Sequence, residues 1–215
     1  MKHPDRRLRS YRDLLIAEPS SVTSVREPGP AWALHVEDAL AAADLVRSLD
    51  PAVAVDVGSG GGSPGIPLAL ALDLPTTLLE ASARKCRFLE RAAVACAAPC
   101  DVVHARSEDY ARGEGRDAFP AAFARALAPP PVAAELVLPL VQPGGAAVLW
   151  TAQVDAGALS TVAGLLAASV EDVQFAGGRR NLVVLRKHGP TPERFPRRPG
   201  MARTRPLVPV PSSAT

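Results

Sequence analysis

A cluster of glycines directly follows a short apolar run near residue 55. The run contains Val53, Val55 and Val57, and the cluster at 58–62 reads GSGGG, which includes the spacing G-x-G-x-G. Because glycine has no Cβ, it tolerates positive φ and lets the backbone come very close to a ligand. An apolar run that enters such a cluster is typical of a buried parallel strand that opens into a ligand-binding turn.

The spacing of the glycines and two carboxylates indicates which ligand this turn accepts. A dinucleotide fingerprint reads G-x-G-x-x-G, and its third glycine would fall on Ser63. A dinucleotide carries a pyrophosphate, whereas S-adenosylmethionine (SAM) carries an uncharged ribose and an amino-acid tail. Asp56 precedes the glycines and Glu80 ends the next apolar run, where a carboxylate can accept ribose hydroxyls. We therefore favour SAM over NAD or a glycine-rich turn without a ligand.

Apolar periodicity predicts the elements that must position these residues. Strands are predicted at 53–57, 76–79, 101–104, 118–124, 146–150, 172–175 and 182–186, and helices at 5–17, 31–49, 67–72, 83–97, 132–141 and 156–168. We expect Ser82 to cap the helix at 83–97 and residues 142–145 to form a turn. Alternating strands and helices imply a doubly wound, mostly parallel sheet that binds ligands at the carboxyl ends of its strands.

Composition excludes several classes of protein. The chain has 215 residues, 47% of them hydrophobic and 21% charged, which favours one soluble globular domain. No run approaches 18 apolar residues and the charged N-terminus has no apolar segment behind it, so we expect neither a spanning helix nor a signal peptide. The three cysteines (Cys86, Cys96 and Cys100) have no C-x-x-C spacing, which argues against disulfides and zinc. We expect reduced thiols, no metal and a cytoplasmic location.

Basic residues gather at both ends of the chain. The first 14 residues hold five basic side chains against two acidic ones, and the stretch from Arg179 onward holds nine against Glu193 alone. The net charge of +2 therefore hides an acidic body between two basic ends. Such ends favour an anionic macromolecule, most plausibly nucleic acid, although a solvated tail explains the charge alone equally well.

Several motifs, taken together, resemble one family. They are YRDLL, HVEDAL, DVGSGGGSPGIPLAL, LLEASARKCRFLE, ARSED, ARALA, PGG and NLVVLRKHGPTPERFPRRPG. The set resembles the bacterial glucose-inhibited division protein B (GidB, RsmG) family. The resemblance implies a SAM-dependent methyltransferase that modifies N7 of a guanine in the 530 loop of 16S rRNA. It implies a protein that acts on the 30S ribosomal subunit and not at a membrane. We also expect a monomer, although the sequence does not reveal the oligomeric state.

The resemblance also implies a fold class and a domain order. The expected fold is the α/β class I SAM-dependent methyltransferase (Rossmann-like) fold, a seven-stranded mostly parallel sheet with helices on both faces. We expect an N-terminal helical extension at 1–50, the SAM-binding domain at 51–188 and a basic, proline-rich tail at 189–215.

The cofactor site that the family implies spans both halves of the sequence. Its matched positions are Gly58, Ser63, Ser107, Glu108 and Arg125, and Asp56, Gly60, Gly62 and Glu80 complete it. Gly58, Gly60 and Gly62 are expected to let the backbone approach the methionine and adenosine moieties. Asp56 is expected to orient the turn and the cofactor's amino group, and Glu80 to hold the ribose. Ser107 and Glu108 recognise the adenine. Arg125 pairs with the cofactor carboxylate or a substrate phosphate, which makes it a candidate catalytic residue.

The substrate side is less determined by the sequence. His35 is a second catalytic candidate, although packing or orientation explains a lone helical histidine better than substrate contact does. The expected RNA contacts are Arg194, Arg197, Arg198, Arg203 and Arg205. Trp32, Trp150, Tyr110, Phe119 and Phe195 are the aromatic side chains available to stack on the target base.

The chain departs from the family at four places. Ser63 replaces a Leu or Phe, Ala39 replaces a hydroxyl residue, Trp150-Thr151 replaces Lys-Gly, and Phe119-Pro120 occupies a region where an aspartate is usual. These departures keep two alternatives open, a diverged methyltransferase for another RNA or a small molecule and a non-catalytic ribosome- or RNA-binding protein.

Overall fold

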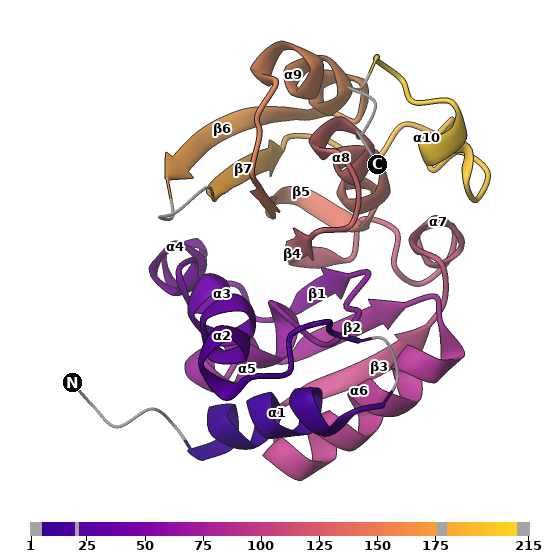
Figure 1. Cartoon of the computed structure of the whole chain (residues 1–215). Helices are drawn as coiled ribbons and strands as arrows, with labels where there is room; N and C mark the ends of the chain where they lie inside the picture. Colours follow the sequence, from indigo (N-terminus) through magenta and orange to yellow (C-terminus); the bar gives the residue numbers. More distant parts are fainter. Residues whose placement is uncertain (1–5, 20–21, 176–179, 210–215) are drawn as a thin grey trace. The chain divides into compact units, whose positions relative to one another are not determined.

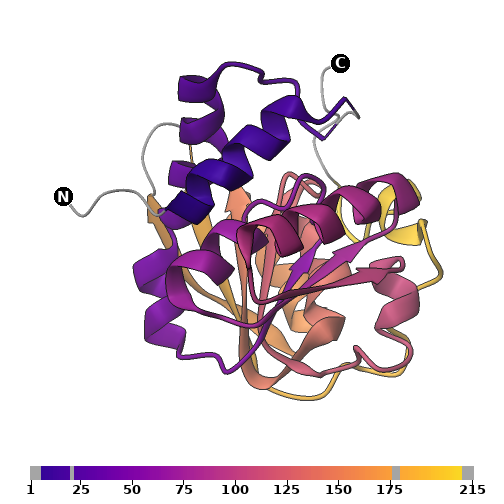
Figure 2. The same cartoon turned by 90° about the horizontal axis from the view of Figure 1, so that it is seen from below.

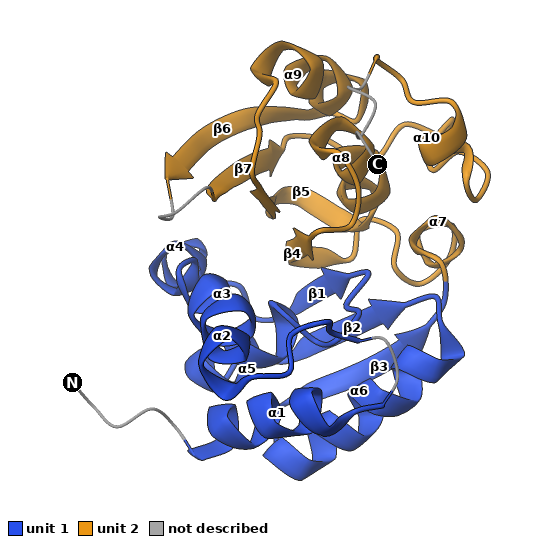
Figure 3. Ribbon diagram, viewed as in Figure 1, with its two compact units in different colours: residues 1–105 blue, residues 106–215 orange. Residues whose placement is uncertain are grey.

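The structure of the chain is a computed structural model that describes residues 6–19, 22–175 and 180–209. The chain forms two compact units, unit 1 with residues 1–105 and unit 2 with residues 106–215 (Figures 1 and 3). Within the described residues, no helix is long and apolar enough to cross a membrane. The boundary between the units falls inside the predicted domain 51–188, and the predicted limits at residues 50 and 188 stay predictions.

The sheet of unit 1 has three parallel strands in the order β3-β2-β1. Its elements are β1 (Ala54–Val57), α5 (Gly65–Leu72), β2 (Thr76–Glu80), α6 (Ala83–Cys96) and β3 (Cys100–His104). All four residues of β1 are buried, as expected for a parallel strand covered on both faces. Val57 pairs with Leu79, so the glycine turn after β1 and Glu80 at the end of β2 lie at the same edge of this sheet.

The residues before β1 form α1 (Arg6–Ala17) and then a broken series of short helices. That series is α2 (Pro28–Trp32), the π-helical turn η1 (Ala33–Glu37), α3 (Asp38–Leu40) and α4 (Ala43–Leu49). The prediction of one continuous helix over 31–49 was wrong. The Asp38 amide donates to the Ala33 carbonyl five residues back, which is the π-helical pattern. His35 and Val36 of this turn are both buried.

Helix α1 packs alongside α6, as Figures 1 and 2 show. Leu8, Tyr11 and Leu15 from α1 share one hydrophobic core with Phe88 and Leu89 from α6. Helical spacing of apolar residues predicted this face of α1. The N-terminal helix is therefore a part of the core of unit 1.

The sheet of unit 2 has four strands in the order β4-β5-β7-β6. Strands β4 and β5 are parallel, whereas β7 is antiparallel to both of its neighbours. The elements are α7 (Ser107–Tyr110), β4 (Phe119–Arg125), α8 (Pro130–Val137), η2 (Leu138–Leu140), β5 (Val141–Thr151), α9 (Ala156–Leu165), β6 (Ala168–Phe175), β7 (Asn181–Lys187) and α10 (Met201–Thr204).

Two boundaries in unit 2 differ from the predicted ones. Residues 142–145 do not separate a helix from a strand, because β5 already begins at Val141 and bulges before its regular pairing with β4. Pro120 lies at the facing irregularity of β4, where its missing N–H costs no ladder bond. Helix α9 ends at Leu165 and β6 begins three residues later, since Ala167 adopts a left-handed φ of 56°.

Candidate functional site

The glycine turn of unit 1 has the backbone conformation that the sequence predicted. Gly58, Gly60 and Gly62 have φ values of 71°, 58° and 93°. A Cβ at Gly62 would lie 2.6 Å from the Ile66 side chain, so packing within the chain requires that glycine. A Cβ at Gly60 would meet nothing closer than the Gly58 carbonyl at 3.7 Å. Gly60 therefore leaves room for the approach of a ligand.

Glu80 is tied to this turn by backbone amides. Its Oε2 accepts from the Gly60 amide at 2.9 Å and its Oε1 accepts from the Ser82 amide at 2.8 Å. Glu80 is 7% exposed. Because each carboxylate oxygen has two lone pairs, one on each oxygen remains for a ribose hydroxyl. Ser82 is the N-cap residue of α6, as predicted. Its hydroxyl makes no capping hydrogen bond, so the predicted side-chain cap was wrong.

Asp56 lies on β1, and its carboxylate reaches the N-terminus of α5. Its Oδ2 accepts from the Gly65 amide at 3.1 Å, and the side chain is 1% exposed. A dinucleotide would need to place its pyrophosphate against amides at the start of this helix. A buried carboxylate there repels that anion and uses one of the amides. The arrangement fits a nucleoside without a pyrophosphate, such as SAM, better than NAD.

Ser63 joins the glycine turn to the N-terminal helices. Its hydroxyl donates to the His35 carbonyl at 2.8 Å, and His35 Nε2 lies 2.8 Å from the Thr23 hydroxyl. Both Ser63 and His35 are less than 8% exposed. The serine that replaces an apolar family residue thus gains an internal partner, and the contacts of His35 favour orientation over substrate chemistry.

Tyr11 is a further residue of this region, and the sequence predicted no role in the site for its side chain. Its hydroxyl donates to the Gly61 carbonyl at 2.9 Å, and its side chain is fully buried. A Cβ at Gly61 would lie 2.9 Å from the Leu15 side chain. Helix α1 therefore supports the turn directly. A polar tip on an otherwise apolar helix face was the only signal for this role.

In unit 2, the predicted adenine residues lie on the short helix α7. Glu108 is 8% exposed, and its Oε1 accepts from the Gly200 amide at 2.8 Å. Its Oε2 lies 3.3 Å from the Ser107 hydroxyl, which donates to it. The sequence did not predict that the C-terminal segment contacts this carboxylate.

Arg125 ends β4, where it pairs in register with Trp150 of β5. A hollow of about 710 Å³ lies next to these strand ends within unit 2. Trp150, Thr151 and Asp155 contribute to its lining. The Trp150 ring packs edge-on against Phe123 and is 4% exposed, so it is largely part of the core.

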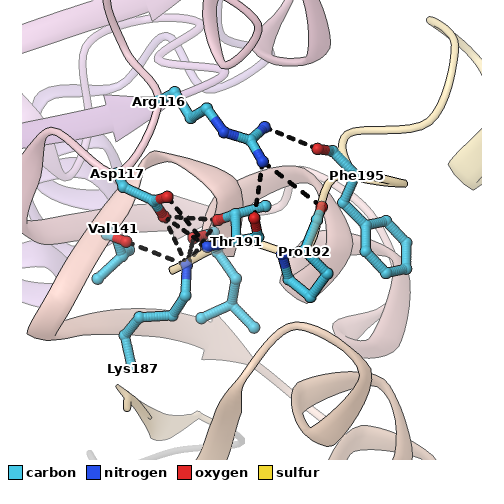
Figure 4. A network of polar contacts seen from close by, with 8 residues as sticks. Arg116, Asp117, Val141, Lys187, Thr191, Pro192 and Phe195 are labelled. Atoms are coloured by element: carbon cyan, nitrogen blue, oxygen red, sulfur yellow. Dashed lines mark hydrogen bonds and ion pairs between the residues drawn. The ribbon is translucent and has the colours of Figure 1, made fainter. Parts of the chain in front are cut away.

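A buried lysine organises the region where unit 2 continues into the C-terminal segment (Figure 4). Lys187 is fully buried, and its Nζ donates to Asp117 Oδ1 (2.9 Å), the Thr191 hydroxyl (2.7 Å) and the carbonyls of Leu138 (2.9 Å) and Val141 (3.1 Å). Asp117 stands two residues before β4, so an aspartate is present in the region that we described as lacking one.

The pKa values of Asp117 and Lys187 both lie below the ordinary values of these side chains. Burial by itself raises the pKa of Asp117, but hydrogen bonds from Thr191 and Lys187 outweigh it and lower that pKa below its ordinary value. Burial lowers the pKa of Lys187, partly against the attraction of Asp117. The sequence signal was a lysine inside an apolar strand, which marks a charge that needs buried partners.

Arginines fix the C-terminal segment further along. Arg116 donates to the carbonyls of Thr191 and Phe195, both at 2.7 Å (Figure 4). Arg197 forms a two-pronged pair with the buried Glu135, with Nε and Nη2 at 2.5 and 2.6 Å from its oxygens. This pair raises the pKa of Arg197, chiefly through the hydrogen bond.

The predicted RNA contacts therefore fall into two groups. Arg197 uses its donors on Glu135, and Arg203 donates to the Leu127 carbonyl at 2.8 Å. Arg194 lies over the Phe195 ring at 5.3 Å. Arg198 and Arg205 are exposed, and neither side chain has a partner among the described residues. Those two are the better candidates for phosphate contacts.

The cysteines carry no reactive chemistry here. Burial raises the pKa of Cys96 to about 11 and that of Cys100 to about 12, so both stay protonated thiols at neutral pH. Among the described residues, no group of three or more His, Cys, Asp or Glu side chains is placed to hold a metal ion.

Comparison with known proteins gives one consistent family. The family model of GidB, described as rRNA small subunit methyltransferase G, matches residues 6–183. Proteins named ribosomal RNA small subunit methyltransferase G are similar in sequence: that of Rubrobacter xylanophilus is 37% identical over 203 residues, which cover 87% of this chain and 77% of the relative. That of Sorangium cellulosum is 36% identical over 194 residues, with 87% and 80% covered.

Solved structures of low sequence identity share the fold. A putative O-methyltransferase from Klebsiella pneumoniae matches with a TM-score of 0.58 at 13% identity, covering 88% of this chain and 93% of that one. A mutant of MtNAS in complex with S-adenosylmethionine matches with a TM-score of 0.58 at 14% identity, covering 85% and 72%. The predicted fold class, a seven-stranded, mostly parallel class I methyltransferase sheet with helices, is confirmed.

Proposed function

The chain belongs to the GidB family of rRNA small subunit methyltransferases G, and from this premise we propose that it methylates N7 of a guanine in the 530 loop of 16S rRNA. We further propose that it acts as a cytoplasmic monomer on the small ribosomal subunit. SAM is its methyl donor, as in the family. The finer assignment of base and position rests on the motifs shared with the family.

One observation carries the cofactor assignment, the hydrogen bond between Gly60 and Glu80. It fixes a buried carboxylate beside a turn that leaves room at Gly60. The carboxylate keeps acceptor capacity for ribose hydroxyls, while Asp56 at the start of α5 disfavours a pyrophosphate. We expect Gly58, Gly62 and Ser63 to shape the same turn. The roles of Ser107, Glu108 and Arg125 in holding the cofactor stay predictions.

The chemistry asks mainly for alignment by the protein. When bound, SAM supplies an activated methyl group on a sulfonium centre. Because guanine N7 has a free lone pair at neutral pH, no side chain of the chain needs to remove a proton first. Holding the two reactants in line can supply about 7–11 kcal/mol of the barrier. His35, whose ring and carbonyl are engaged inside unit 1, is therefore not required as a general base.

We assign the RNA contacts chiefly to exposed arginines of the C-terminal segment. Arg198 and Arg205 are exposed and have no side-chain partner in the part of the chain that the structure describes, so they can pair with phosphates, which position the RNA without reading its sequence. Binding through them should weaken steeply as salt concentration rises.

Transfer of labelled methyl groups tests the proposal. Unmodified 30S subunits, bare 16S rRNA and a panel of small molecules are offered in parallel, and the modified base is then mapped. Label at N7 of a guanine in the 530 loop of the 30S subunit is the expected result. Label on another RNA or a small molecule would favour a diverged methyltransferase. SAM binding without transfer would favour a non-catalytic ribosome-binding protein.

A further inference from the structure

Glu108 is held by a residue far away in the sequence. The Gly200 amide donates to Glu108 Oε1 at 2.8 Å, across 92 residues. Gly200 is the N-cap of α10 and has a φ of 84°, a conformation that glycine adopts without strain. Among the described residues, the only other donor to this carboxylate is the Ser107 hydroxyl, 3.3 Å from Glu108 Oε2. The orientation of Glu108 therefore depends on where the C-terminal segment places one amide.

The position of that amide is fixed on both sides. Three residues earlier, Arg197 grips the buried Glu135 with two donors, and the Arg197 carbonyl accepts from Arg112 Nη2 at 2.8 Å. Two residues later, Ala202 is buried against Val132 and Leu136 of α8. Charge-assisted bidentate pairs of this kind are short and directional. The segment around Gly200 is thus docked on unit 2 like an element of the fold.

We propose that this docked segment positions Glu108 for the cofactor, with Arg197 and Gly200 as positioning residues. The inference rests on the proposed function, because it takes Glu108 to contact the adenine of SAM. It goes beyond that function in assigning part of the basic tail to cofactor affinity as well as to RNA. A chain whose segment is undocked should hold SAM weakly even when its glycine turn is intact.

A matched pair of variants in the full-length chain tests the proposal. Arg197→Gln breaks the pair with the buried Glu135. Arg186→Gln breaks a more exposed pair, which joins Arg186 of β7 to Glu171 of β6. Each variant removes one cation and one Arg–Glu pair from unit 2. We expect the SAM Kd measured by calorimetry to rise about tenfold in Arg197→Gln and to stay at the wild-type value in Arg186→Gln, a coupling within the usual range. Arg197→Lys, which keeps the charge but not the fork, should fall between them.

A second measurement on the wild-type chain covers the case in which Arg197→Gln fails to fold. If the segment and the cofactor are coupled, SAM must slow hydrogen exchange at the Gly200 amide, because such coupling is reciprocal. An unchanged exchange rate at Gly200, or equal SAM affinity in the two glutamine variants, would overturn the proposal and leave the proposed function standing. Absence of SAM binding by the wild type would instead overturn the proposed function, and this inference with it.

Discussion

Glu80 and Glu108 are both predicted to contact SAM, but the backbone amides that hold them come from different distances along the chain. Glu80 of unit 1 is gripped by the amides of residues 60 and 82, which belong to the adjoining turn and the following helix. Glu108 of unit 2 is gripped by the amide of residue 200, which comes from the end of the chain. The first is a local device of strand and turn, whereas the second depends on long-range packing. Local devices leave patterns in the sequence, and long-range ones leave almost none.

The largest effect is expected from breaking a second long-range contact of unit 2, the ion pair between Asp117 and Lys187. Asp117→Ala leaves the fully buried Lys187 without the carboxylate at 2.9 Å. Breaking a buried ion pair in this way costs about 3–5 kcal/mol, because an uncompensated charge stays in the interior. Urea unfolding should show that loss. An equal effect from Asp172→Ala, an exposed acid of unit 2, would contradict the special role of the pair.

The local device breaks through backbone strain. Gly62→Ala places a Cβ 2.6 Å from Ile66 at a φ of 93°, so we expect a loss of about 1–3 kcal/mol in the free energy of unfolding. Gly164→Ala in the exposed last turn of α9 meets nothing within 4 Å and should instead stabilise by about 0.5–1 kcal/mol. Thermal unfolding of the two variants compares them, and a change of the same sign in both would rule out strain at Gly62.

Glu80→Gln tests whether the carboxylate held by the glycine turn contributes to SAM affinity. The amide side chain keeps the shape but presents an N–H₂ where one oxygen accepted a backbone amide, so one of the two bonds to Gly60 and Ser82 is lost. We expect about a tenfold rise in the SAM Kd by calorimetry, together with a loss of about 1–3 kcal/mol in the free energy of unfolding because one buried amide is left without its acceptor. Unaltered affinity would remove Glu80 from the cofactor site.

The smallest expected effect is on pH dependence. Since the pKa of Asp117 is lowered in the folded chain, its contribution is fully present above the ordinary Asp pKa of about 4 and is lost as pH falls through the folded-state pKa. The stability difference between the wild type and Asp117→Asn should therefore be full near pH 6 and shrink below about pH 4. Urea titrations at stepped pH measure this difference. A difference that grows on acidification would contradict a lowered pKa of Asp117 in the folded chain.

What could be predicted from the sequence follows the same division. The valines before Gly58 and the acid at Glu80 lie within one strand–turn–helix–strand unit, so their types and spacing were enough to place them. The π-helical turn at Ala33–Glu37 escaped prediction because no residue preference marks it. The partners of Lys187 and Glu108 escaped because each pair is brought together by the whole of unit 2. Arg197 was predicted to meet RNA, since nothing local tells a paired arginine from a free one.

The Glu108–Gly200 bond also bears on how this chain is made. A ribosome releases the N-terminal half first, and the glycine turn with both partners of Glu80 is complete by residue 82. The Glu108 carboxylate lacks its partner until residue 200, which is 92 residues further along the chain, has left the exit tunnel. A nascent chain in which residue 200 is still inside the ribosome therefore lacks the hydrogen bond that orients Glu108 on α7.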